Sequence, residues 1–223
     1  MDILKQYEVF EMEVMNRMNS AKMLDPLVFG GGSMLRLCHE LNRYSVDLDF
    51  WFVKKVSQDD FFLKTQQAFE KDYEMTDAQM KHFTMLFELR SPKYPRRLKI
   101  EIRRKVQDCD YQQNIAFSKF STKQVVLKTH TLDQTMKNKI EAFIERGEIR
   151  DCFDIEFMAR KGVEIPLREE KESAVFLEKI AGLKERDFKV KLGSILENDI
   201  REYYVRNRFR FLQDRLRNEK DAS

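Results

Sequence analysis

The sequence has little glycine, proline or cysteine, and it has no long apolar stretch. Among 223 residues there are seven glycines, four prolines and three cysteines. The cysteines, Cys38, Cys109 and Cys152, stand far apart without a C-x-x-C pair, which argues against a disulfide framework and against a zinc site. No apolar run approaches the roughly 18 residues that a membrane-spanning helix needs. We therefore expect a protein that is neither stabilised by disulfides nor membrane-spanning.

The start of the chain also lacks the pattern of a secretory signal. The segment MDILKQYEVFEMEV carries acidic residues where a signal peptide has a basic stretch followed by an apolar one. We expect a cytoplasmic protein without a membrane partner. Charge is abundant but balanced, with 41 Lys and Arg against 38 Asp and Glu, so the net charge of +3 indicates little about partners. Eighteen Phe and eleven Met supply the apolar area for a packed core.

Hydrophobic periodicity divides the chain into a mixed first part and a helical second part. We expect helices over 3–23, 33–41 and 57–73, and strands over 27–29, 47–53, 82–90, 97–105 and 123–129. Ser33 and Ser57 are placed to cap the second and third helices. From Thr131 onward the apolar spacing is helical, with no internal repeat. The pattern predicts an α/β core over residues 1–130 and a helical domain over 131–223.

Three of the seven glycines are consecutive and precede a serine. Gly30, Gly31 and Gly32 leave the backbone without Cβ atoms, so that a ligand can approach their N–H groups closely. If a helix begins at Ser33, these N–H groups and the helix dipole form an anion site. A plain strand-to-helix turn is the alternative, although it needs only one glycine.

Two aspartates follow at a spacing typical of a metal site. In a strand, Asp47 and Asp49 point to the same face, where two carboxylates repel each other unless a hard divalent cation lies between them. Glu101, in an alternating segment, is a candidate third carboxylate from a neighbouring strand. Two alternatives stay open: a solvent-exposed strand also tolerates paired acids, and Glu101 can equally be a surface residue.

A Gly-Ser turn, a D-x-D strand and a third acid form the layout of the nucleotidyltransferase superfamily. G-G-S followed by a helix and R-Y-S-x-D-L-D-F resembles, more narrowly, the AbiEii family, also called the MenT-like nucleotidyltransferase toxins. The second signature of that family is a helix lysine followed by R-D-x-x-D, matched here by Lys139 and by residues 150–154. The two signatures span residues 30–155 in the family's order. Family members often carry Thr where Ser33 stands, which keeps the hydroxyl.

The resemblance implies a nucleotidyltransferase-type mixed sheet and a Mg²⁺-dependent nucleotidyltransferase that uses an NTP. Gly31, Gly32 and Ser33 would hold the triphosphate of the nucleotide. Asp47 and Asp49 would bind Mg²⁺. Nucleotidyl transfer requires mainly an in-line acceptor and stabilisation of charge on the phosphorus, which metal, lysine and backbone N–H groups supply.

The resemblance gives further roles to the second signature. Lys139 would neutralise phosphate charge, and Asp151 or Asp154 would lie near the metal or orient the acceptor. Without the resemblance, Lys139 reads as a solvated helix lysine, and the two aspartates read as favourable residues at a helix N-terminus. Ser45, by strand alternation, shares the face of the D-x-D pair and is a candidate nucleotide-binding residue. Phosphate on its hydroxyl would place negative charge beside the metal site.

The resemblance also suggests what the protein does. It implies the toxin of a toxin–antitoxin or phage-defence pair, with a cognate antitoxin, that transfers NMP to the 3′ end of tRNA. Two other functions stay open: a non-catalytic nucleotide- or RNA-binding module on the same fold, and a nucleotidyltransferase that modifies a protein or a small molecule.

A basic segment near the C-terminus is a candidate surface for the acceptor. Residues 201–217 contain six arginines and two acids, a local charge of +4, interleaved with aromatic residues. As one helix, this segment would place Arg206 and Arg210 one turn apart, suited to phosphates and unpaired bases. The alternative is a helix whose aromatic residues pack in the core and whose arginines are solvated.

Overall fold

The protein is described by a computed structural model that covers residues 3–167 and 170–221. The chain divides into two compact units. Unit 1 comprises Met1–Glu40 and Tyr44–Thr131, and unit 2 comprises Leu41–Arg43 and Leu132–Ser223. The chain therefore passes from unit 1 to unit 2 after Thr131. In addition, three residues between the second helix and the second strand, Leu41–Arg43, belong to unit 2.

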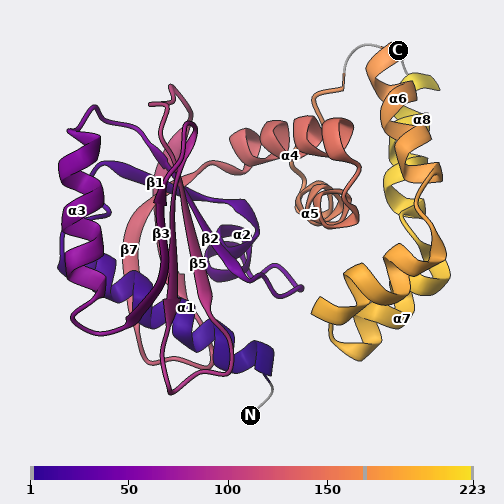
Figure 1. Ribbon diagram of the computed structural model, residues 1–223. Coiled ribbons are helices and arrows are strands. Elements are labelled where there is room, and N and C mark those ends of the chain that lie inside the picture. The colour runs from indigo at the N-terminus through magenta and orange to yellow at the C-terminus, as the bar shows by residue number, and fades with distance from the viewer. Residues whose placement is uncertain (1–2, 168–169, 222–223) are drawn as a thin grey trace. The chain divides into compact units, whose positions relative to one another are not determined.

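Unit 1 is a seven-stranded mixed sheet with three helices (Figure 1). The strands are β1 Leu27–Gly30, β2 Asp47–Phe52, β3 Glu74–Met80, β4 Thr84–Arg90, β5 Leu98–Arg103, β6 Tyr111–Phe117 and β7 Gln124–His130, and the helices are α1 Ile3–Ser20, α2 Gly31–His39 and α3 Gln58–Phe69. The strand order is β3-β4-β5-β2-β1-β7-β6. Strand β1 is parallel to β7 and β2 is parallel to β5, whereas the other neighbours are antiparallel. The predicted mixed α/β fold is confirmed.

The two faces of the sheet differ in polarity, as the alternation in β2 shows. Leu48, Phe50 and Phe52 are buried, while Asp47, Asp49 and Trp51 on the opposite face are only half-buried. Rings of α3 pack against the buried face, because Phe61 contacts Phe52 and Phe69 contacts Phe87 of β4. The D-x-D pair therefore lies on the face opposite the apolar core.

Two strands were not expected, and one expected cap is wrong. Strands β3 (EMTDAQM) and β6 (YQQNIAF) form the two edges of the sheet, where few side chains are buried and the sequence shows little apolar alternation. Helix α2 begins at Gly31 with Gly30 as its N-cap, so Ser33 lies inside the first turn. The cap of α3 is confirmed, because the Ser57 hydroxyl accepts a hydrogen bond from the N–H of Asp60.

Unit 2 is helical, as the periodicity predicts. Its helices are α4 Leu132–Arg146, α5 Ile149–Arg160, α6 Glu170–Ala181, α7 Asn198–Asn207 and α8 Arg210–Asp221, with a π-helical turn η1 Asp187–Leu192 and a 3₁₀ turn η2 Gly193–Ile195 before α7. Buried aromatic rings join them, since Phe143 contacts Phe176 and Phe188 contacts Phe209. No helix in the described ranges is long and apolar enough to cross a membrane.

The expected single helix over 201–217 is a further correction. The backbone of Arg208 has a positive φ of 51°, which ends α7 before α8 begins at Arg210. Arg206 and Arg210 therefore do not lie one turn apart on one helix. Tyr204 and Phe209 are buried, so these two rings pack in the interior of unit 2 and are not surfaces for stacking bases.

Candidate functional site

The glycine turn brings the backbone against the D-x-D strand. Gly31 has φ of +72°, and a Cβ atom there would lie 2.4 Å from Oδ2 of Asp49. At Gly30, a Cβ atom would lie 2.6 Å from the Trp51 ring and 2.7 Å from Nδ1 of His130. The first two glycines are thus required for close approach, and the N-terminus of α2 starts directly beside the Asp49 carboxylate.

Strand pairing places further charged residues on the same face. Asp49 is paired with Gly30 on one side and with Glu101 on the other, and Asp47 is paired with Lys99. Paired residues of neighbouring strands share a face, so all three carboxylates lie on the face opposite the core. The Lys99 ammonium forms an ion pair with Glu101. Its hydrogen bond to Glu101, aided by Asp47 and Asp49, raises the pKa of Lys99 despite partial burial.

These residues fit Mg²⁺ as two protein ligands. In nucleotide enzymes Mg²⁺ is commonly held by one or two carboxylates, with substrate phosphates and water completing its shell. Asp47 and Asp49, half-buried at i and i+2 of one strand, suit that arrangement. No group of three or more His, Cys, Asp or Glu within the described ranges is arranged to hold a metal ion. Glu101, held by Lys99, is the weakest of the three predicted ligands.

Ser33 and Ser45 occupy surroundings that the sequence did not predict. Ser33 Oγ is fully buried, 2.6 Å from the carbonyl oxygen of Asp47 and 2.9 Å from Oε1 of Glu11. Burial raises the pKa of Glu11 well above its ordinary value. The Ser33 hydroxyl therefore ties α2 to β2 and α1, which leaves its backbone N–H for an anion. Ser45 lies before β2 begins, so strand alternation does not fix its face.

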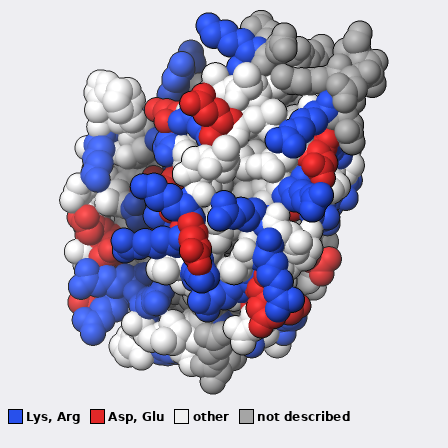
Figure 2. All heavy atoms as spheres, turned by 90° about the vertical axis from the view of Figure 1, so that its right-hand side faces the viewer, with Lys and Arg blue, Asp and Glu red and all other residues white. Residues whose placement is uncertain are grey.

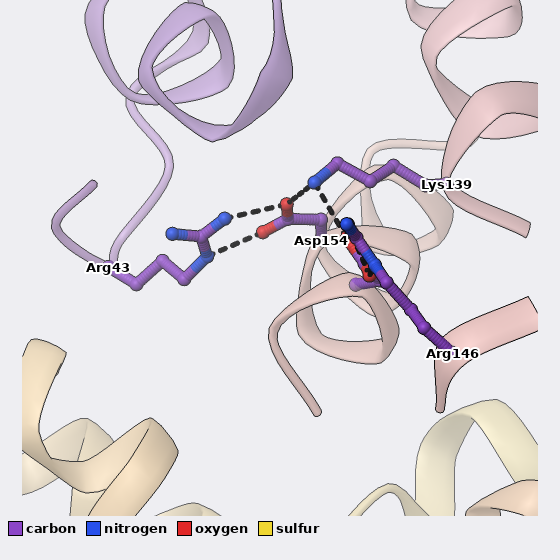
Figure 3. A network of polar contacts seen from close by, with 5 residues as sticks. Arg43, Lys139, Arg146 and Asp154 are labelled. Carbon is purple, nitrogen blue, oxygen red and sulfur yellow. Dashed lines mark hydrogen bonds and ion pairs between the residues drawn. The ribbon is translucent and has the colours of Figure 1, made fainter. Parts of the chain in front are cut away.

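The second signature forms an ion-pair network in unit 2, in which both aspartates are buried and Arg146 is exposed (Figure 3). Lys139 Nζ on α4 lies 2.9 Å from Oδ1 of Asp151 and 2.7 Å from Oδ2 of Asp154, both on α5. The Arg43 guanidinium donates two hydrogen bonds to Asp154, from Nε to Oδ1 at 2.6 Å and from Nη2 to Oδ2 at 2.7 Å. Arg146 binds Asp151 in the same way, at 2.8 and 3.0 Å. Three cations thus contact two carboxylates in this network.

The network changes the chemistry expected of the two aspartates. Burial alone would raise the pKa of Asp154, but Arg43 and Lys139 outweigh it and hold this pKa below its ordinary value. A carboxylate bound on both oxygens by cations is a poor metal ligand and a poor general base. Lys139 stays charged for the same reason: burial lowers its pKa, yet Asp154 and Asp151 raise it above the ordinary value. Both carboxylates are instead held against the Lys139 ammonium.

Arg43 is a member of this network for which the sequence indicates no role. The segment Leu41–Arg43 belongs to unit 2. It contacts that unit through the Arg43 side chain and through a β-bridge between Arg43 and Leu196. Arg43 is four residues ahead of Asp47, and it is the arginine of the R-Y-S-x-D signature. That signature was the available signal, but nothing in the local sequence identifies a partner 111 positions away.

The comparisons with known proteins agree with the geometry. A family model described as "Nucleotidyl transferase AbiEii toxin, Type IV TA system" matches residues 13–222. The chain belongs to the AbiEii family. The resemblance carried by the two signatures is thereby confirmed: the protein is a nucleotidyltransferase of a type IV toxin–antitoxin family, which implies an NTP substrate and a cognate antitoxin. No curated protein matches the chain.

Two solved structures share the fold of this AbiEii chain. A proposed nucleotidyltransferase from H. pylori is 18% identical with a TM-score of 0.58, and the match covers 94% of this chain and 96% of that one. JHP933 from Helicobacter pylori is 17% identical with a TM-score of 0.54, and the match covers 96% of this chain and 95% of that one. At this identity the likeness establishes the fold and carries no residue roles.

Proposed function

We propose that this AbiEii nucleotidyltransferase uses a Mg²⁺-bound NTP at the junction of the glycine turn and β2, and transfers NMP to the 3′ end of tRNA. The observation that carries the proposal is the close approach of Gly31 to the Asp49 carboxylate, at the N-terminus of α2. A helix N-terminus favours phosphate, and an adjacent carboxylate pair favours a divalent cation. An anion site and a cation site side by side match a metal–triphosphate.

Each residue has a limited task in this proposal. The N–H groups of Gly31, Gly32 and Ser33 hold phosphate oxygens, and the buried Ser33 hydroxyl keeps this turn aligned with β2. Asp47 and Asp49 hold Mg²⁺, which when bound neutralises charge on the phosphates. None of these groups forms a covalent bond to the substrate, so catalysis rests on orientation and on charge stabilisation.

Lys139 remains the proposed phosphate-neutralising cation. Its ammonium donates to Asp151 and Asp154, and its third N–H has no partner among the described residues. Asp151 and Asp154 fix the position of this ammonium and keep it protonated. In this proposal they act on the substrate only through Lys139.

The experiment identifies the nucleotide and the acceptor together. The purified protein is incubated with Mg²⁺, total cellular RNA and each of the four α-labelled NTPs in turn, and the labelled pool is identified. We expect label in tRNA with a restricted choice of NTP. Label in a protein or in a small molecule would replace the acceptor but keep the reaction, whereas no label with any NTP and acceptor would favour a binding module.

A matched set of variants tests the site. Asp47→Asn and Asp49→Asn should each lower transfer at least about 100-fold, because each removes a charged metal ligand while the side chain keeps its size. Asp77→Asn on the edge strand β3 makes the same chemical change outside the site and should transfer at the wild-type rate. Near-wild-type transfer by either site variant at saturating Mg²⁺ would refute the metal assignment.

A further inference from the structure

Strand β6 forms an edge of the sheet with unusual features. It pairs with β7 on one side, and the described part of unit 1 places no strand on its other side. Its seven residues, YQQNIAF, include no charged residue, proline or glycine, and five of the seven are exposed. Soluble proteins normally protect an edge strand with charges, proline or a bulge, because its unpaired N–H and C=O groups otherwise pair with another strand.

The other edge of the same sheet has that protection. Strand β3 carries Glu74 and Asp77, and its register shifts between Met75 and Asp77 as in a β-bulge. Helix α3 packs beside β3 and α2 packs beside β6, so helix cover does not distinguish the two edges. The difference in charge and in strand regularity between the two edges indicates that the hydrogen-bonding edge of β6 is left open for pairing.

Large apolar side chains are exposed on β6 and on the neighbouring strand β7. Tyr111, Ile115 and Phe117 lie on one face of β6 and are 47%, 50% and 38% exposed. Val126, the register partner of Ile115 on β7, is 56% exposed. A cluster of large apolar side chains next to an unpaired strand edge is typical of a protein–protein contact.

We propose that β6 pairs antiparallel with β6 of a second copy of this chain, about a two-fold axis at Asn114. This register pairs all seven residues of the two strands. The two residues of each cross-strand pair are an even number of positions apart in the sequence, so side chains from the same face of β6 lie opposite each other. Tyr111 then lies opposite Phe117 of the other copy, an aromatic cross-strand pair that occurs twice. Gln113 lies opposite Ile115, and no like charges meet.

The flanks of β6 favour a second copy over a foreign strand. Asp108 and Asp110 precede the strand, and the exposed Lys119 follows it. Antiparallel pairing about Asn114 places the acidic flank of each copy beside the basic flank of the other, so the charges are complementary at both ends. The strand is therefore complementary to itself in hydrogen bonding, in aromatic contacts and in charge.

Sedimentation velocity of the full chain over a range of micromolar concentrations tests the proposal. The wild type should sediment with twice the mass of one chain. Two variants that differ at one position test the register, since position 113 of one copy lies opposite position 115 of the other. Gln113→Glu with Ile115→Glu sets like charges opposite each other and should abolish the dimer, whereas Gln113→Glu with Ile115→Lys sets opposite charges there and should restore it.

Both variants keep a glutamate beside Lys128, the register partner of position 113, so the hairpin itself is equally supported in each. Gln79→Lys on β3 is the control for an added charge at the other edge and should stay dimeric. Circular dichroism confirms that each variant is folded. A wild type with the mass of one chain at all concentrations would overturn the proposal, and so would a folded Glu/Glu variant that remains dimeric.

Discussion

At the scale of single residues, Gly31 combines a backbone conformation that favours glycine with close approach to a proposed metal ligand. Its φ of +72° favours glycine, and its Cα faces the Asp49 carboxylate. Gly162 has a similar φ of +87°, but nothing lies within 4 Å of a Cβ added there. The two glycines therefore separate the effect of backbone conformation from the effect of close approach.

We expect Gly31→Ala to lower nucleotidyl transfer at least about tenfold, since the methyl group must displace Asp49 or the start of α2. Gly162→Ala should cost only the left-handed backbone conformation, about 1 kcal/mol, and should leave transfer unchanged. Urea unfolding and the transfer assay measure the two quantities. Equal transfer by the two variants would show that the Gly31–Asp49 approach has no functional role.

At the scale of elements, the ion-pair network joins α4, α5 and the Leu41–Arg43 segment. Asp154 is fully buried and is bound by both Arg43 and Lys139. Asp154→Ala should lower the free energy of unfolding by about 3–5 kcal/mol, because two buried cations lose their shared partner. Replacing the pair together, with Arg43→Met and Asp154→Leu, should cost less than the single change.

An exposed pair serves as the control for this prediction. Arg206 and Glu202 lie one turn apart on α7, with their side chains 76% and 68% exposed. Glu202→Ala should change the free energy of unfolding by less than about 1 kcal/mol. The midpoint and slope of urea unfolding give both values. A loss at Asp154 as small as that at Glu202 would mean that the network does not hold unit 2 together.

The network also predicts how stability depends on pH. The pKa of Asp154 is lower in the folded protein than its ordinary value near about 3.9, because Arg43 and Lys139 outweigh its burial. Its contribution is therefore complete above about pH 4 and is lost as the pH falls through the folded-state pKa. Asp154→Asn should flatten the decline in unfolding free energy as the pH falls below about 4. Parallel wild-type and variant curves would contradict this assignment.

The elements also show what local sequence could and could not predict. The apolar periods predicted β2, β4, β5 and the helices of unit 2, because each buries one face. Strands β3 and β6 could not be predicted, because edge strands bury few side chains and these two carry amide and acidic residues. The break at Arg208 could not be predicted, because an arginine with a positive φ has no sequence signal. The partner of Arg43 depends on tertiary structure alone.

At the scale of the whole molecule, basic and acidic residues nearly balance, with 41 Lys and Arg against 38 Asp and Glu. Figure 2 shows basic side chains interspersed with acidic ones over the face that it draws. The segment 201–217 nevertheless has a local charge of +4. Its buried rings leave it fewer aromatic surfaces than the sequence suggested, while Arg206, Arg208 and Arg210 are exposed. Recognition of an RNA backbone through charge is the part of the acceptor hypothesis that the structure still favours.

If these arginines contact the acceptor, binding must weaken as salt rises. Each phosphate contact on single-stranded RNA contributes about 0.7 to the slope of log affinity against log salt, so reversing all three should flatten that slope by roughly 2. Glu substitutions at Arg206, Arg208 and Arg210 should raise the KM for tRNA and leave the KM for NTP unchanged. The same reversal at the exposed Lys54, Lys55 and Lys105 of unit 1 controls for net charge. If both triple variants flatten the slope equally, the RNA responds to overall charge, and the segment 201–217 is not the acceptor surface.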